Sequence, residues 1–121
     1  MDLNSEKLTR KIVEILDHKK AQDITVLDIQ GVSLLSDYFV ICNGSSTVQI
    51  KALADHIEEM LGEMGYSPNH KEGYHSASWI LLDYGEIVVH IFHQESRVFY
   101  NLERMWSDAK QVDIENIISR I

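Results

Sequence analysis

The sequence is poor in the residues that mark secreted, membrane-bound or disordered chains. It holds a single cysteine, Cys42, and a single proline, Pro68, among 121 residues. One cysteine cannot form an internal disulfide, and no apolar run is long enough to span a membrane. The N-terminal stretch 1–6 is acidic and lacks the apolar core of a signal peptide. We therefore expect a folded cytoplasmic protein without membrane contact.

Basic residues are also scarce. Lys and Arg number 11 against 19 Asp and Glu, which gives a formal charge of −8. Direct nucleic-acid binding usually rests on clustered cations that displace phosphate counterions. The composition therefore argues against direct, sequence-specific nucleic-acid binding. An acidic surface suits a basic protein partner or serves solubility alone.

Hydrophobic periodicity predicts one α/β (α+β) domain over residues 1–121, with a mixed sheet and amphipathic helices mainly on one face. Helices are expected at 5–18, from the Asn43–Thr47 turn to about Glu63, and from Glu95 or Ser96 to Asp108. Strands are expected at 24–29, 38–42, 79–83 and 86–92. Asp113 is expected to cap a last short helix, so that 110–121 would form a C-terminal helical extension.

The segment 79–92 is the most informative part of the sequence. Tyr84-Gly85 between two apolar runs predicts a two-residue hairpin turn, which would place Asp83 opposite Glu86 and Trp79 opposite His90. Alternation then assigns one face to Trp79, Leu81, Val88, His90 and Phe92. The other face receives Ile80, Leu82, Ile87, Val89 and Ile91. Because both faces are apolar, both need cover, and we expect a partner to supply one of the covers.

Two patterns suggest an enzyme or a metal site. Gly44-Ser45-Ser46 joins a strand to a helix, as in the phosphate-binding turn of nucleotidyltransferases. Those enzymes also carry an acidic pair for two metals, and the helix after Gly44 lacks one. The alternative is a serine that caps a helix after a tight turn.

The histidines include His70, His75, His90 and His93, but none has the i, i+4 spacing of a zinc protease. We expect no cofactor, no metal and no enzymatic activity. Cys42, within an apolar strand, is expected to be a buried structural thiol.

Several blocks of the sequence resemble one family in unbroken order from about Leu8 to Ala109. They are Ser36-Asp37-Tyr38-Phe39-Val40-Ile41, Gly44-Ser45-Ser46 with Gln49, Glu72-Gly73, Trp79-Ile80-Leu81-Leu82-Asp83-Tyr84-Gly85, Val88-Val89-His90-Ile91-Phe92, and Arg97-x-Phe99-Tyr100-x-Leu102-Glu103-x-Met105-Trp106-x-Asp108-Ala109. Together they resemble the ribosomal silencing factor family (RsfS, Iojap-like). One departure is Met105, where the family often has leucine, a volume-conserving change.

The resemblance implies a nucleotidyltransferase-like fold without catalytic carboxylates. It also implies binding to the large ribosomal subunit through the ribosomal protein numbered fourteen. Occupying that surface would block joining of the small subunit and repress translation, and the family is associated with large-subunit biogenesis. On this reading we expect the hairpin to carry the partner-binding residues Trp79, Leu81, Asp83, Tyr84, Glu86, Val88, His90 and Phe92. The same apolar face could pair two free copies as a homodimer. The alternative is a divergent nucleotidyltransferase-fold enzyme that binds phosphate at Gly44-Ser45.

Overall fold

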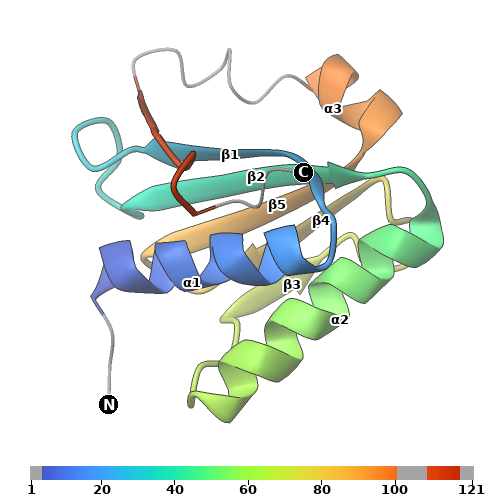
Figure 1. The fold of residues 1–121 in the computed structure, drawn as a ribbon, viewed down its shortest axis with the longest axis horizontal. Coiled ribbons are helices and arrows are strands. Elements are labelled where there is room, and N and C mark those ends of the chain that lie inside the picture. Colours follow the sequence, from blue (N-terminus) through green and yellow to red (C-terminus); the bar gives the residue numbers. More distant parts are fainter. Residues whose placement is uncertain (1–3, 101–108, 118–121) are drawn as a thin grey trace.

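A computed structural model describes residues 4–100 and 109–117. Along the chain the elements are α1 (Ser5–His18), β1 (Gln22–Asp28), β2 (Tyr38–Gly44), α2 (Thr47–Glu63), β3 (His70–Glu72), β4 (Trp79–Asp83), β5 (Ile87–His93), α3 (Gln94–Tyr100) and β6 (Lys110–Val112). Helices α1 and α2 lie together on one side of the sheet (Figure 1). The predicted mixed sheet with helices mainly on one face is confirmed.

The two long helices begin where their capping residues predict. The Asn4 side chain accepts a hydrogen bond from the Lys7 N–H at 2.8 Å and starts α1. Ser46 does the same for the Gln49 N–H at 3.1 Å and starts α2. Gly65, with φ of 91°, follows the end of α2, where a left-handed residue commonly stops a helix. These local signals therefore fix both helices.

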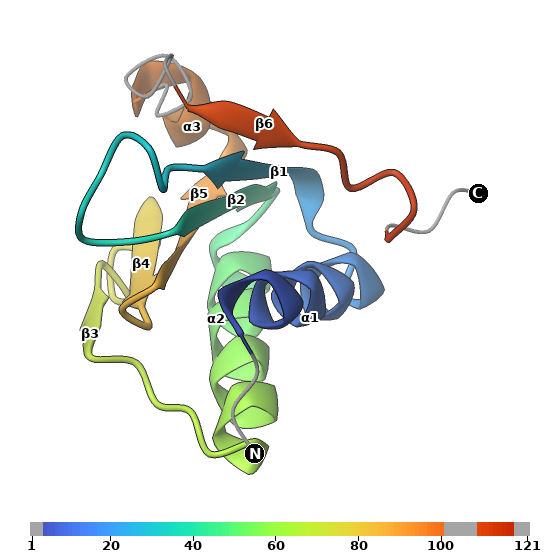
Figure 2. The same ribbon diagram turned by 90° about the vertical axis from the view of Figure 1, so that its left-hand side faces the viewer.

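The described strands form one sheet in the order β3-β4-β5-β2-β1-β6. Strands β2 and β5 are parallel neighbours at its centre, and every other adjacent pair is antiparallel. Strand β6 lies beside β1 at the edge, and the chain after it descends toward α1 (Figure 2).

Three expectations need correction. Residues 110–112 of the expected helical extension form strand β6, which pairs Val112 with Val26. Residues 113–117 that follow form a turn, in which the Asp113 carboxylate accepts from the Glu115 N–H at 2.9 Å. Within the polar stretch after Pro68, residues 70–72 form the unexpected strand β3. The third helix begins at Gln94, and the 101–108 part of the prediction lies outside the described residues.

The hairpin turn lies one residue later than predicted. The Tyr84 N–H donates to the Ile87 carbonyl at 2.9 Å, so Gly85 and Glu86 form the two-residue loop. Gly85 has φ of 89°, which suits the first position of such a turn. Trp79 therefore pairs with Phe92, and His90 pairs with Leu81. Because the register moves by two residues, the predicted division of side chains between the two faces is unchanged.

The sheet separates two apolar clusters. On the helix side, Ile80, Leu82, Ile87, Val89 and Ile91 pack with the apolar stripes of α1 and α2. The buried Cys42 belongs to this core, and burial raises the pKa of its thiol to about 12. The outer face carries a smaller cluster of Leu27, Ile29, Ile41 and Phe92, with Phe39, Trp79 and Ala109 packed against it.

Candidate functional site: the hairpin groove

A groove runs between the β4–β5 hairpin and the loop 30–37 that joins β1 to β2. Its volume is about 430 Å³. It is lined by Ser33, Leu35, Ser36, Phe39, Asn69, His70, Leu81, Asp83, Gly85, Val88 and His90. The four of these that were predicted to bind a partner are Leu81, Asp83, Val88 and His90. We call this feature the hairpin groove.

Four rings form an aromatic cluster on the outer face: Phe39, Trp79, His90 and Phe92. Phe39 and His90 also line the groove. The Trp79 ring stacks on the Phe92 ring with centroids 5.0 Å apart. The Phe39 ring meets the His90 ring edge-on at 4.7 Å. These two arrangements are the offset and T-shaped geometries that aromatic pairs prefer. These ring contacts therefore stabilise the packing of the outer face.

His90 is held neutral within this cluster. Its Nδ1 accepts a hydrogen bond from the Trp79 indole N–H at 3.0 Å, so the ring proton lies on Nε2. Burial lowers the pKa of His90 to about 3. Its Nε2 is buried and has no hydrogen-bond partner among the described residues. The neutral ring therefore has one bonded nitrogen, Nδ1, and one buried N–H donor, at Nε2, without an acceptor in the part of the chain that the structure describes.

Hydrogen bonds at the hairpin turn hold the two sides of the groove together. The Asp83 carboxylate accepts from the Gly85 N–H at 2.7 Å. The Ser36 hydroxyl donates to the Gly85 carbonyl at 2.8 Å, and the Glu86 carbonyl accepts from the Asp37 N–H at 2.7 Å. The end of loop 30–37 is thus tied to the hairpin, although the two are about fifty positions apart in sequence. Asp83 holds the turn in addition to presenting charge at the rim.

The outer face is less exposed than the sequence suggested. Phe92 is fully buried, His90 is 4% exposed and Val88 is 8% exposed, so this part of the face does not need a partner to cover it. Trp79, Leu81 and Asp83 are half-buried, and Glu86 is exposed. Tyr84 packs on the helix-side core, so the structure does not bring it to the groove.

Sequence reasoning missed the apolar tip of loop 30–37. Leu34 is fully exposed, Leu35 is 88% exposed and Val32 is 44% exposed. Single exposed apolar residues are common, but three within four positions beside a groove form a patch. The signal was present as Val32-Ser33-Leu34-Leu35 in a segment predicted to be a loop, where apolar residues have no core to join.

The backbone N–H at the Gly44-Ser45 turn already has a hydrogen-bond partner, the side chain of Gln49. The Gln49 side-chain oxygen accepts from the Ser45 N–H at 2.7 Å and from the Ser45 hydroxyl at 3.1 Å. A phosphate would need this N–H free. A Cβ at Gly44 would lie 3.0 Å from Ile50 Cγ1, so the glycine serves close packing. The turn has the geometry of a helix start rather than of an anion site.

Two carboxylates of α2, Asp55 and Glu58, contact side chains of β3 and of the loop before β4. Asp55 accepts from the Tyr74 hydroxyl at 3.0 Å, and Glu58 pairs with the Lys71 ammonium at 2.7 Å. Within residues 4–100 and 109–117, no three His, Cys, Asp or Glu side chains gather in a way that could hold a metal ion. In the same ranges, no helix combines the length and apolar character that crossing a bilayer demands.

Comparison with known proteins places the chain in one group. The family model described as ribosomal silencing factor during starvation matches residues 2–120. A protein named ribosomal silencing factor RsfS from Halalkalibacterium halodurans is 39% identical over 97% of this chain and all of its own length. The protein of the same name from Bacillus subtilis is 40% identical over 93% of this chain and 96% of its own.

Solved structures agree with the sequence matches. A crystal structure from Bacillus halodurans aligns with a TM-score of 0.81 at 38% identity, covering 90% of this chain and 99% of that one. The match to the family model, over residues 2–120, includes every described helix and strand and the hairpin groove. The chain therefore belongs to the RsfS family of ribosomal silencing factors.

Proposed function

We propose that the protein binds the large ribosomal subunit through the ribosomal protein numbered fourteen and prevents joining of the small subunit. By that occlusion it would repress translation, in the cytoplasm and without catalysis. Family membership over nearly the whole chain is the observation that carries this proposal. A further role in large-subunit biogenesis is compatible with binding the same surface.

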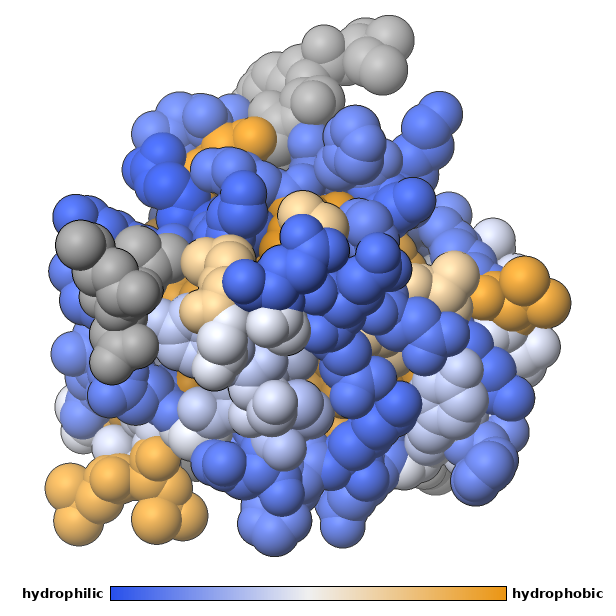
Figure 3. All heavy atoms as spheres, turned by 90° about the horizontal axis from the view of Figure 1, so that it is seen from below, coloured by the Kyte–Doolittle hydropathy of each residue, from blue (hydrophilic) through white to orange (hydrophobic). Residues whose placement is uncertain are grey.

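The hairpin groove is the surface we propose for the contact. Half-buried Leu81 supplies apolar area within the groove, and Leu35 extends that area on the loop side. Half-buried Trp79 lies beside the groove on the same face of the sheet. Asp83 and Glu86 place negative charge at the rim, which suits a basic partner. By contrast, the side of the molecule viewed from the two long helices is mostly hydrophilic, with apolar spheres gathered at its edges (Figure 3).

Sedimentation with isolated subunits tests the proposal. The protein should pellet with free large subunits and not with small ones, and its addition should reduce subunit joining in light scattering. Leu35→Ala should weaken large-subunit binding by at least about fivefold, since it removes apolar contact area. Val48→Ala is the matched control, because Val48 is 78% exposed at the start of α2, outside the groove. Equal binding to both subunits, or to neither, would overturn the proposal.

The enzyme alternative has weaker support. A phosphate at Gly44-Ser45 would have to displace the Gln49 side chain from the Ser45 N–H. We expect no magnesium-dependent nucleotidyl transfer, and a turnover signal abolished by Ser45→Ala would contradict this.

Self-association is a separate proposal for the free protein. A homodimer would bury Leu34 and Leu35 together with the half-buried Trp79, and it would compete with the subunit for the groove. Sedimentation equilibrium of the wild type and Leu34→Ala measures it directly.

A further inference from the structure

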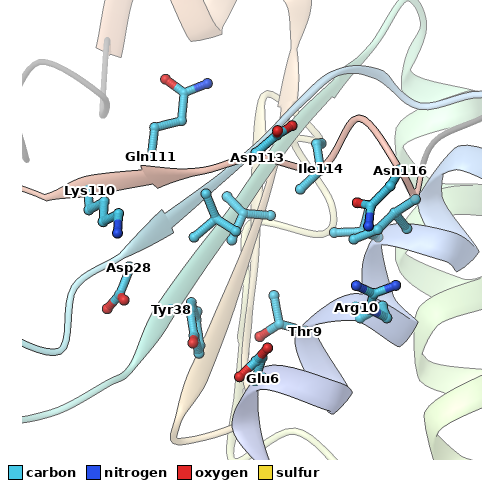
Figure 4. A pocket seen from close by; sticks show the side chains of 14 residues that line it. Glu6, Thr9, Arg10, Asp28, Tyr38, Lys110, Gln111, Asp113, Ile114 and Asn116 are labelled. Carbon is cyan, nitrogen blue, oxygen red and sulfur yellow. The ribbon is translucent and has the colours of Figure 1, made fainter.

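A second cavity lies on the helix side of the sheet, under the edge strand β6. Its volume is about 520 Å³, within the range of small-molecule sites. It is bounded by α1, β1, β2, β6 and the turn that follows β6. Its walls are formed by Glu6, Thr9, Arg10, Val13, Val26, Asp28, Tyr38, Lys110, Gln111, Val112, Asp113, Ile114, Asn116 and Ile117 (Figure 4).

The cavity has an apolar floor. Val13 and Val26 are completely or almost completely buried, and Val112 packs against them from β6. Ile114 and Ile117 continue this apolar wall along the turn. Val13 and Val26 are already shielded, so a ligand with an apolar body would cover the accessible parts of Val112, Ile114 and Ile117.

One end of the cavity gathers oxygen atoms. Glu6, Thr9 and Tyr38 point their oxygens toward the same end, with Asp28 beside them, whereas Arg10 and Asn116 lie at the opposite end (Figure 4). The charges of Asp28 and Glu6 contribute, after burial, to a raised pKa of the Tyr38 hydroxyl, as expected if both carboxylates lie near it. Glu6 forms no ion pair with another described residue. Lys110 on β6 is the cation nearest Asp28 in the strand register.

Thr9 supplies the observation that points to a ligand. The residue is only 6% exposed, and its hydroxyl oxygen is buried with no hydrogen-bond partner among the described residues. A buried hydroxyl without a partner is costly, so such groups usually have one. Thr9 lines the cavity, and a bound donor at the oxygen-rich end would satisfy it.

An ammonium group matches this end. It has three N–H donors and no acceptor, and it carries a positive charge. We propose that the cavity binds a small primary amine, with its ammonium held by the Glu6 carboxylate and the Thr9 and Tyr38 hydroxyl oxygens. The apolar part of the amine lies on the half-buried Val112, Ile114 and Ile117, above the buried Val13 and Val26. This site is independent of the hairpin groove and of the proposed ribosomal role.

Three probes with one indole body test the chemistry. Tryptamine carries an ammonium, tryptophol a hydroxyl and indole-3-propionate a carboxylate. Titration of the full chain, followed by calorimetry and by the amide resonances of Val13, Val26 and Val112, should show tryptamine binding most tightly. Tryptophol should bind at least about tenfold more weakly, the factor expected for losing a charged hydrogen bond. Indole-3-propionate should be the weakest.

Two variants and a control assign the contacts. Glu6→Gln should weaken tryptamine at least about tenfold and leave tryptophol unchanged. Glu14→Gln is the control, because Glu14 is also exposed on α1 but does not line the cavity. Thr9→Val should weaken tryptamine without lowering the melting temperature. The proposal is overturned if tryptamine fails to bind at millimolar concentration, if the three probes bind equally, or if Glu6→Gln and Glu14→Gln behave alike.

Discussion

At the scale of single residues, the contact between Trp79 and His90 determines the tautomer of the histidine and the position of the indole ring. The indole N–H donates to Nδ1, which fixes the neutral tautomer, and the Trp79 ring covers fully buried Phe92. Alternation along the strands was enough to predict that both side chains share a face. It could not predict the hydrogen bond, because the pairing depends on which residues form the turn.

Trp79→Phe should isolate the contribution of that hydrogen bond. The phenyl ring preserves stacking on Phe92 but leaves the buried Nδ1 of His90 without a donor, which costs about 1–3 kcal/mol of unfolding free energy. Urea denaturation measures this cost. In a His90→Leu background the same substitution should cost much less, and equal costs in both backgrounds would show that no coupling exists.

Trp79→Ala should now cost stability as well as binding. If Trp79 were only a partner-binding residue, as the sequence predicts, its truncation would leave the fold intact. The structure gives it a buried hydrogen-bond partner and a stacked neighbour, so we expect a loss of about 2–4 kcal/mol of unfolding free energy. A melting temperature equal to that of the wild type would restore the simpler interface reading.

Acid should destabilise the fold through His90. Its pKa is about 3 in the folded state against about 6.5 when unfolded, so the unfolded chain binds more protons between these values. The contribution of neutral His90 is complete above pH 6.5 and is lost as pH falls toward 3. By pH 5 the loss is about 2 kcal/mol. His90→Asn, which accepts the indole N–H without titrating, should lose less between pH 7 and 5. A parallel decline in both proteins would contradict this assignment.

At the scale of elements, the sequence predicted what is encoded locally. Helices α1 and α2 have capping side chains and apolar stripes, and their observed bounds follow those signals. Strands β3 and β6 have three residues each and are largely exposed, so they show no alternation to detect. Each exists because another strand offers a free edge: β4, the next strand along the chain, for β3, and β1, far earlier in the sequence, for β6. Such pairing is a property of the assembled sheet, which single-sequence patterns do not contain.

Gly73 illustrates an element connection that only the structure explains. It lies between β3 and β4 with φ of 79°, and a Cβ there would lie 2.0 Å from the Trp79 carbonyl oxygen. Gly65 is the matched control, since its φ is 91° and nothing lies within 4 Å of its Cβ position. Gly65→Ala should cost about 1–2 kcal/mol for the left-handed backbone alone.

Gly73→Ala should cost clearly more, about 3 kcal/mol or above, because backbone atoms must also move. Thermal or urea unfolding of the two variants compares them directly. Similar losses would mean that the segment before β4 can shift freely.

At the scale of the whole molecule, charge and apolar surface are divided between regions. The chain carries −8 overall, yet exposed Leu35 lines the groove next to exposed Leu34, and Glu86 follows the groove-lining Gly85 in the hairpin turn. The acidic composition suits either a basic partner or solubility alone, and it does not indicate where a partner would bind. The loop is held beside the hairpin by hydrogen bonds from Ser36 and Asp37 to the turn. These bonds join residues far apart in the sequence, so no local sequence pattern predicts them.

The distribution of charge predicts how association with the large subunit responds to salt. If the groove is the contact, Glu86 lies close to a basic partner during encounter, because it adjoins the groove-lining Gly85 in the hairpin turn. Glu59 is equally exposed but belongs to α2, from which no residue lines the groove. One charge at about 10 Å in water contributes roughly 0.4 kcal/mol, so Glu86→Gln should slow association roughly twofold at low ionic strength. The difference should fade above about 0.1 M salt, where screening acts within about 10 Å. Stopped-flow association rates at two salt concentrations measure this, with Glu59→Gln as the control of equal charge change. If both variants slow association equally, overall charge drives the encounter and the groove is not where the subunit arrives.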